Sequence, residues 1–273
     1  MDWYKYMTET VKSKIIKYPH GFSVRTGGVS EGTFASLNLG MNRGDDEKKV
    51  KKNWEIFLES CQMAGMDFVC GKQIHENNVA IVGRENASPA YGQKSLIEAD
   101  GYVSAEPLVP VAIFTADCTP LLLADEENRV VGAIHCGWRS TVSDIEKNAI
   151  DAMVSLGGNP KSIKASMGPA IGICCFEVGP EVVKAACELV GMDMEDTIRK
   201  SNDFALVKPS RNEGKYMLDL QGFIKLRLLQ LGLREENIEI LDECTMCKQG
   251  KYWSHRGTAG IRGSQANIIM IPG

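Results

Sequence analysis

Residues 109–136 read VPVAIFTADCTPLLLADEENRVVGAIHC, three apolar runs separated by two short polar breaks. The runs at 109–114, 121–124 and 130–134 are continuous rather than alternating, which predicts strands that are covered on both faces. Cys118 lies in the first break, and His135 directly follows the third run. Because functional side chains gather where neighbouring strands of an α/β sheet end, we expect Cys118 and His135 to converge.

Outside this stretch, helical and strand-like patterns interleave along the chain. Capping residues and apolar spacing predict helices from 45 to about 65, at 140–156, from 180 to about 189, and at 217–231. Apolar runs predict further strands at 79–82, 238–241 and 268–271. Because no segment has the composition of a linker, we expect a single domain over residues 1–273. The predicted fold class is α/β (α+β in some schemes), with mixed β-sheets flanked by helices.

Length, charge and composition restrict the class of protein. The chain has 273 residues, near the upper size for one hydrophobic core, and its 44% hydrophobic and 24% charged residues are typical of a globular protein. A net charge of −4 argues against a nucleic-acid partner. The sequence has neither an apolar stretch of the ~20 residues that span a bilayer nor a signal-peptide pattern. We therefore expect a cytoplasmic protein with no membrane partner, and a monomer because no interface stripe is evident.

Two histidines and a cysteine have the residue types of a zinc site. Only four histidines occur in the chain, and His75 and His135 lie on either side of Cys118 in the sequence. Zinc prefers imidazole and thiolate ligands, and three protein ligands with an open fourth position describe a catalytic zinc site. The separations are far too long for a zinc finger, so the whole fold would have to assemble the site. Taken singly, each residue is more ordinarily a loop histidine or a core cysteine, but their shared position at strand ends favours the site.

Arginines in glycine-rich or helix-initiating segments are candidate anion ligands. Arg139 lies next to the helix expected at 140–156, where unpaired backbone N–H groups and the helix dipole favour an anion. We therefore predict that Arg139 and Arg25 help to bind phosphate. Arg256 and Arg262, in the glycine-rich closing segment, are further candidates. The alternative for each of them is a solvated side chain.

Nine cysteines occur in the chain without the density of a disulfide-rich protein. In a reducing compartment most of them should be buried thiols that pack as small hydrophobic side chains. Cys244 and Cys247 have the C-x-x-C spacing of half a zinc knuckle or of a redox pair. No second C-x-x-C pair occurs, so we expect two partly buried thiols near a strand end, and we interpret Cys174 and Cys175 in the same way.

Seven short segments together resemble a known family. They are RTGGVS at 25–30, SLNLG at 36–40, QIH at 73–75, ADG at 99–101, TADCTP at 115–120, HCGWR at 135–139 and GPAIG at 168–172. With these segments the chain resembles the laccase-domain (polyphenol oxidase-like) purine nucleoside phosphorylase family, which includes bacterial YlmD- and YfiH-like proteins and FAMIN. The resemblance extends to 252–262. That closing segment departs from the family pattern, because His255 stands where tyrosine is more usual and a single Arg256 replaces two adjacent arginines.

The resemblance implies a fold, a metal and two reactions. The fold would be that of the YfiH-like proteins, which resembles certain toxin deamidases. His75, Cys118 and His135 fall on the family's zinc ligands, so zinc is the expected cofactor. The implied reactions are deamination of adenosine and phosphorolysis of adenosine, inosine, guanosine and S-methyl-5'-thioadenosine to the free base and ribose 1-phosphate. Purine nucleosides and phosphate are therefore the expected partners.

Other interpretations of the same residues stay open. A multicopper oxidase would need about ten imidazoles for its coppers, and the four histidines of this chain restrict copper to a weak secondary activity at the zinc site. Cys118 and His135 could instead be the nucleophile and base of a metal-free hydrolase or deamidase, which leaves His75 without a role. A non-enzymatic nucleotide sensor with a structural zinc is a third interpretation. In the zinc enzyme, Asp117 or Glu76 is the candidate for proton transfer.

Overall fold

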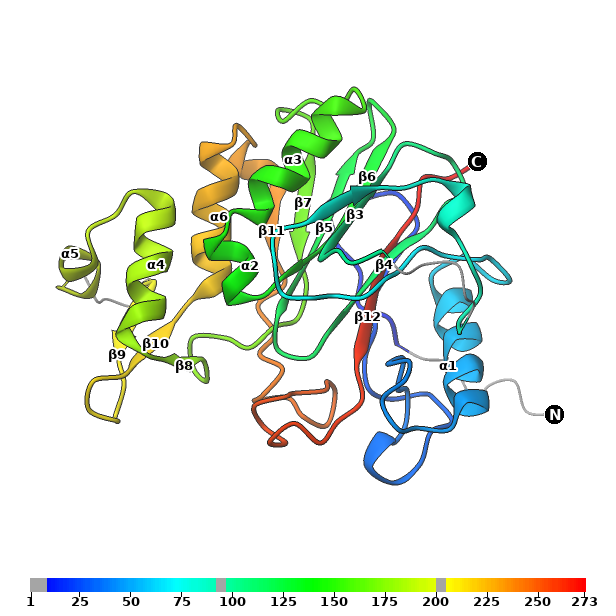
Figure 1. Ribbon diagram of the computed structural model, residues 1–273, viewed down its shortest axis with the longest axis horizontal. Coiled ribbons are helices and arrows are strands. Elements are labelled where there is room, and N and C mark those ends of the chain that lie inside the picture. The colour runs from blue at the N-terminus through cyan, green and yellow to red at the C-terminus, as the bar shows by residue number, and fades with distance from the viewer. Residues whose placement is uncertain (1–8, 92–96, 200–204) are drawn as a thin grey trace.

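In the computed structural model, which describes residues 9–91, 97–199 and 205–273, a six-stranded mixed sheet forms the centre of the molecule (Figure 1). Its strands, in spatial order, are β11 (Ile238–Ile240), β7 (Lys164–Met167), β5 (Thr119–Asp125), β6 (Val130–Cys136), β3 (Gly101–Ser104) and β2 (Val79–Ile81). The neighbours β5 and β6 pair antiparallel along their full length, and every residue in both is buried. The continuous apolar runs therefore form interior strands, as the sequence predicts.

A second, three-stranded antiparallel sheet packs against one face of the first (Figure 1). Its order is β1 (His20–Phe22), β12 (Gln265–Ile269) and β4 (Val111–Thr115). Because successive side chains of a strand point to opposite faces, Leu122 and Ala124 of β5 pack toward this second sheet. Leu121 and Leu123 pack toward the helices on the other face. Burial on both faces is the reason that this stretch of sequence is continuously apolar.

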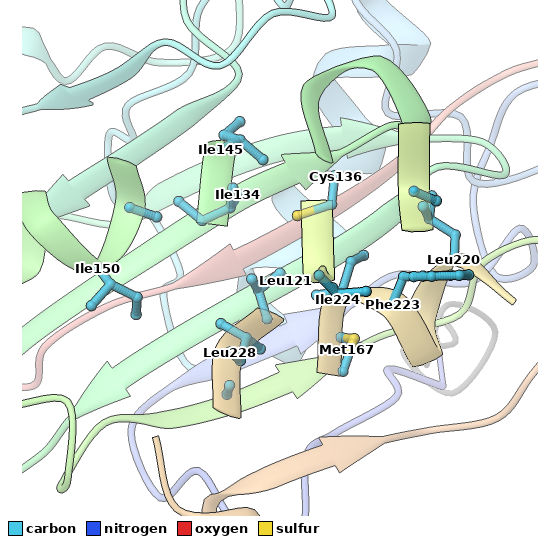
Figure 2. Packing of buried hydrophobic residues seen from close by; sticks show 14 of the residues in the cluster. Leu121, Ile134, Cys136, Ile145, Ile150, Met167, Leu220, Phe223, Ile224 and Leu228 are labelled. Atoms are coloured by element: carbon cyan, nitrogen blue, oxygen red, sulfur yellow. The ribbon is translucent and has the colours of Figure 1, made fainter. Parts of the chain in front are cut away.

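Helices cover the remaining face of the six-stranded sheet (Figure 1). They are α3 (Ile145–Ser155), α6 (Leu220–Gln230) and, packed beside α6, α4 (Pro180–Val190). Figure 2 shows Leu121 and Met167 from the sheet lying among Ile224 and Leu228 of α6. The helix expected from Pro180 is confirmed, with proline in its first turn. No helix within the described residues is long and apolar enough to cross a bilayer.

Helix α1 (Glu47–Ser60), which the sequence predicts, covers the outer face of the three-stranded sheet (Figure 1). Asp46 caps it, because its side chain accepts a hydrogen bond from the backbone N–H of Lys48 at 2.8 Å. Trp54 anchors the helix by stacking on Phe68, with ring centroids 4.1 Å apart. The helix ends at Ser60, a few residues before the expected boundary.

The prediction of a single continuous helix at 140–156 is wrong. The structure has α2 (Trp138–Val142) and α3, separated by Asp144, whose φ of 66° lies in the left-handed region and ends the first helix. The Asp144 carboxylate receives two hydrogen bonds from the Arg227 guanidinium of α6, at 2.6 and 2.8 Å. This ion pair joins residues 83 positions apart, so the local sequence carries no signal of the break.

The helix predicted at 217–231 also begins too early. Tyr216–Leu218 is strand β10, which pairs with β8 (Glu177–Val178) and β9 (Val207–Pro209) in a small third sheet. Helix α6 then begins at Leu220, because the Asp219 side chain accepts from the backbone N–H of Gly222 at 3.0 Å and caps it. Among the described residues, the remaining helical elements are α5 (Met194–Arg199) and the 3-10 turns Gly32–Phe34, Arg84–Asn86 and Glu235–Asn237.

Candidate active site

The pairing of β5 with β6 brings Cys118 and His135 together. Pro120 lies opposite His135 in the register, and Cys118 immediately precedes β5. The loop before β2 carries His75 to the same place, so that one ligand atom from each of the three side chains lies within 4.8 Å of the others. The two imidazole rings are nearly perpendicular, at 88°, with centroids 4.8 Å apart. The fold thus assembles the His–Cys–His group from segments that are distant in sequence.

Asp100, which immediately precedes β3, is fully buried and connects the two histidines. Its carboxylate accepts hydrogen bonds from the backbone N–H groups of Ile74, His75 and Glu76, at 2.9, 3.0 and 3.1 Å. These bonds hold His75 in the left-handed backbone region, at a φ of 60°, which residues with side chains rarely adopt. The same carboxylate accepts from Nδ1 of His135 at 2.7 Å.

The hydrogen bond from His135 to Asp100 determines which imidazole nitrogen is available. Because Nδ1–H donates to the carboxylate, Nε2 is left to bind a metal, and a carboxylate in this position orients the ring and increases its basicity. The sequence did not single out Asp100, whose only signal was its place in the segment 99–101. Its role depends on His75 and His135, which are 25 and 35 positions away.

Opposite charges are paired within this group. Burial would raise the pKa of the Cys118 thiol, but His135 and His75 lower it to about 6. Burial would lower the pKa of His135, but Cys118 and Asp100 raise it to about 9. Burial also acts to raise the pKa of Asp100, yet hydrogen bonds from His135 and from backbone N–H groups bring it below its ordinary value. Two anionic groups therefore flank one imidazole, and a bound cation would replace the imidazole proton.

The three side chains line a cavity of about 890 Å³. This volume lies in the range of small-molecule sites. Aromatic rings in the wall offer stacking surfaces for a heterocycle, and guanidinium groups offer partners for an anion. The aromatic, cationic and other polar lining residues include Tyr91, Phe114 and Phe176, then Arg43, Arg256 and Arg262, and then Asn42, Gln73, Asp117 and His255.

Arg262 has the properties of an anion ligand. Burial, followed by the nearby charge of Arg43, lowers the pKa of Arg262 to about 10. Its terminal Nη1 donates to the Gly263 carbonyl at 3.0 Å and to Ser264 Oγ at 2.9 Å. Its Nε is buried and has no hydrogen-bond partner within the described residues. Two arginines close together with an unpartnered buried donor favour a bound anion. Arg262 was a sequence candidate, whereas Arg43 carried no sequence signal.

The structure does not bring Arg25 or Arg139 to the cavity wall, as far as the described residues define it. The Arg25 guanidinium lies 4.1 Å from the Trp253 ring centroid and donates to the carbonyl groups of Ala35 and Gln249, at 2.9 and 3.1 Å. The Arg139 guanidinium lies 4.3 Å from the ring centroid of Trp138. Both cations are therefore engaged with an aromatic face elsewhere in the fold.

Asp117 and Glu76, the candidates for proton transfer, occupy different environments. Asp117 lines the cavity, but Oδ1 accepts from Thr245 Oγ1 at 2.6 Å and Oδ2 accepts from the backbone N–H of Arg256 at 2.7 Å. Its carboxylate therefore ties the segment that carries Cys118 to the closing segment. Glu76 is exposed, and the cavity lining defined by the described residues does not include it.

Comparison with known proteins identifies the family. A model of the family described as multi-copper polyphenol oxidoreductase laccase matches residues 19–272. The chain belongs to this family. A protein of Bacteroides thetaiotaomicron named purine nucleoside phosphorylase is 32% identical over 256 residues, which cover 92% of this chain and 91% of that relative. A protein of an unknown prokaryotic organism, named adenosine deaminase RL5, is 29% identical over 250 residues, which cover 89% and 90%.

A solved structure agrees with this assignment. The crystal structure of YfiH from Bacillus licheniformis is 28% identical, covers 92% of each chain and superposes with a TM-score of 0.83. The mixed α/β fold is therefore shared along nearly the whole chain. The family description refers to several coppers, but this laccase-family chain has only four histidines. Of these, His20 lies apart from the cavity, where its Nε2 accepts from the backbone N–H of Ser13 at 2.8 Å.

Proposed function

We propose that this chain is a zinc-dependent purine nucleoside phosphorylase that also deaminates adenosine. The observation that carries the proposal is one cavity that joins the His75–Cys118–His135 group to three arginines and three aromatic rings. Arginines are suited to bind phosphate, and aromatic rings are suited to stack on a purine. The names of the Bacteroides relative and of RL5 support the same pair of reactions. The proposed nucleosides are adenosine, inosine, guanosine and S-methyl-5'-thioadenosine.

The donor set fits zinc. Two imidazoles and a thiolate with a lowered pKa converge within 4.8 Å, and Asp100 supports one of the imidazoles from behind. His75, Cys118 and His135 would hold the ion, which when bound supplies a Lewis acid and activates water for attack on the purine. Copper in the same site would give at most a secondary oxidase activity.

Side chains of the cavity wall would position phosphate, the second reactant of phosphorolysis. In phosphorolysis, phosphate attacks the anomeric carbon of ribose while the purine departs, so phosphate must be held and oriented without its water shell. Arg262 and Arg43 are suited to this because both line the cavity and Arg262 is half-buried. His255, which also lines the cavity, is our candidate proton donor to the departing base. Asp117 is a positioning residue, because both its oxygens are engaged.

A metal-free cysteine hydrolase is the second candidate function. It is favoured by one observation, the lowered pKa of Cys118 beside the raised pKa of His135, which is the pattern of a thiolate–imidazolium pair. It gives no role to His75, although the Asp100 carboxylate holds the backbone of His75 in a left-handed conformation beside Cys118. The zinc enzyme accounts for all three side chains.

One assay separates these functions. The purified protein is analysed for zinc and copper and then incubated with adenosine, with and without phosphate. Adenine and ribose 1-phosphate that form only with phosphate identify the phosphorylase, and inosine formed without phosphate identifies the deaminase. Cys118→Ala should lose the metal held with His75 and His135 and both activities, whereas Cys187→Ala, which removes a buried thiol of α4 away from the cavity lining, should keep them.

Two results would count against the proposal. A zinc-loaded protein that forms neither product would refute the substrate class. Activity that survives complete zinc removal but disappears in Cys118→Ala would establish the metal-free mechanism. We also propose a cytoplasmic location, because a reducing compartment keeps the Cys118 thiol available for the metal, and a monomeric state, which sedimentation would test.

A further inference from the structure

Two cysteine pairs that are far apart in sequence meet at the edge of the six-stranded sheet. Cys174 and Cys175 lie in the segment after β7, and Cys244 and Cys247 lie in the segment after β11. The two strands are parallel neighbours, so their following segments leave the sheet side by side. The four sulfur atoms all lie within 4.8 Å of one another. The expectation of partly buried thiols is confirmed for Cys175 and Cys244 and is wrong for Cys174 and Cys247, which are exposed.

The spacing of the sulfur atoms fits one metal ion. Sγ of Cys247 lies 3.5 Å from that of Cys174 and 3.4 Å from that of Cys175. Zinc bonded to four sulfurs at about 2.3 Å would set them about 3.8 Å apart at the corners of a tetrahedron. An iron–sulfur cluster places several iron ions between its cysteines and so spreads their sulfurs farther than a single ion does. A single ion matches the observed group best.

Disulfide bonds fit the group less well. The sulfur distances of 3.4 and 3.5 Å exceed the bonded distance of about 2.05 Å. Adjacent Cα atoms across a trans peptide are about 3.8 Å apart, which is shorter than the usual separation across a disulfide, so Cys174 and Cys175 are poorly placed to pair with each other. All nine cysteines lie in the described residues, and all are free thiols.

The backbone around Cys244 supports a sulfur that carries negative charge. The backbone N–H of Gly172 donates to Cys244 Sγ at 3.3 Å, which links the two segments directly. A second link is the bridge between Ala170 and Cys244, in which Thr245 N–H donates to the Ala170 carbonyl at 2.9 Å. Packing explains only part of this arrangement, because Cys175 and Cys244 lie against the hydrophobic core but Cys174 and Cys247 are exposed.

We propose that Cys174, Cys175, Cys244 and Cys247 bind a structural zinc ion, distinct from the metal at the His–Cys–His group. Four thiolate ligands leave no open position, so the ion would have a structural rather than a catalytic role. By binding cysteines of both segments, the ion would act as a clamp that joins the segment after β7 to the segment after β11. The inference does not depend on the proposed nucleoside chemistry.

The clamp would support one wall of the cavity. Thr245, between the two cysteines of the C-x-x-C pair, donates through Oγ1 to Asp117, the residue before Cys118. Ile171, shortly before Cys174, donates its backbone N–H to the Asp117 carbonyl at 2.9 Å and also lines the cavity. Phe176, which directly follows Cys175, lines the cavity as well. Metal at the four cysteines would therefore keep the Asp117 segment and the aromatic wall in place.

Metal counting with matched variants tests the proposal. The full-length protein, purified under reducing conditions and loaded with zinc, should contain two zinc ions per chain. Cys118→Ala should retain one, and the double variant Cys244→Ser with Cys247→Ser should also retain one, whereas the control Cys187→Ala should retain two. X-ray absorption at the zinc edge of Cys118→Ala should show only sulfur neighbours, at about 2.3 Å.

The proposal is overturned if Cys118→Ala contains no zinc while remaining folded, or if its remaining zinc has nitrogen neighbours. Should the double variant fail to fold, alkylation of the wild-type chain followed by mass spectrometry gives the answer. The four cysteines should resist alkylation with zinc present and react after a chelator is added, and equal reaction in both conditions would refute the site. Sulfur-only zinc in a chain without nucleoside activity would uphold this inference while the proposed function fails.

Discussion

Asp100 accepts a hydrogen bond from Nδ1 of His135 at 2.7 Å, and both side chains are buried. The same carboxylate fixes the backbone of His75. One residue thus orients two of the three proposed metal ligands. The geometry of the site therefore depends on a residue that does not itself belong to the His–Cys–His group.

Asp100→Asn should weaken zinc binding by about 10–100-fold, the usual effect of losing a partner behind a metal-bound histidine. An amide cannot accept from all four donors, and its own N–H₂ would face N–H groups. Zinc affinity is measured by competition with a chelator. Asp125→Asn is the matched control, because Asp125 is equally buried but accepts from Asn128 and Asn159 at the far end of β5. Equal losses of affinity in both variants would contradict a specific role for Asp100.

The variant His75→Ala distinguishes the zinc mechanism from a metal-free mechanism that uses only Cys118 and His135. If three ligands hold the metal, this variant should lose the zinc of the His75–Cys118–His135 site and both proposed reactions, because a two-ligand site is much weaker. If Cys118 and His135 act alone, activity should persist with little change. The measurements are zinc content and the rates of adenine and inosine formation. Retained activity in a His75→Ala protein that has lost the zinc of the His75–Cys118–His135 site would exclude the metal mechanism.

Arg262→Ala should raise the KM for phosphate by about 10–100-fold, because a hydrogen bond to a charged group contributes about 1.5–3 kcal/mol. Deamination of adenosine, measured without phosphate, should fall much less. Arg139→Ala is the informative comparison, since the Arg139 guanidinium lies over Trp138 and should leave the phosphate KM nearly unchanged. A larger rise of the phosphate KM in Arg139→Ala than in Arg262→Ala would show that phosphate binds beside Arg139, as the sequence predicted.

Glu146 predicts a pH dependence of stability. It is fully buried, its Oε1 accepts from Thr141 Oγ1 at 3.0 Å, and its Oε2 has no partner within the described residues. Burial above all raises the pKa of Glu146 from 4.5 to about 7. Between these pH values the folded chain keeps a proton that the unfolded chain has released, so the free energy of unfolding should fall as pH rises from about 4.5 to 7.

Glu146→Gln should remove this dependence. One pKa unit corresponds to about 1.4 kcal/mol, so the variant should match the wild type near pH 4 and exceed it by up to ~3 kcal/mol at pH 8. Urea unfolding at several pH values measures the difference. Parallel stability curves for the two proteins would show that ionisation of Glu146 is not coupled to folding.

Local sequence determined the parts of this protein that depend on burial and capping. Continuous apolar runs predicted β5 and β6 because strands covered on both faces need no polar side. The acidic pair Asp45-Asp46 predicted the start of α1 to within two residues, because a cap acts within one turn. The convergence of Cys118 and His135 also followed, because both lie at the ends of those strands.

Contacts between distant segments decided the rest. The break at Asp144 depends on Arg227, the orientation of both histidines depends on Asp100, and the pair of arginines in the cavity wall depends on the approach of Arg43 to Arg262. The four-cysteine group exists only because β7 and β11 are parallel neighbours. A hydrogen bond or a coordination shell forms between atoms a few ångströms apart in space, whatever their separation in sequence. The sequence therefore supplied the chemical groups, and the tertiary structure alone decided which of them meet.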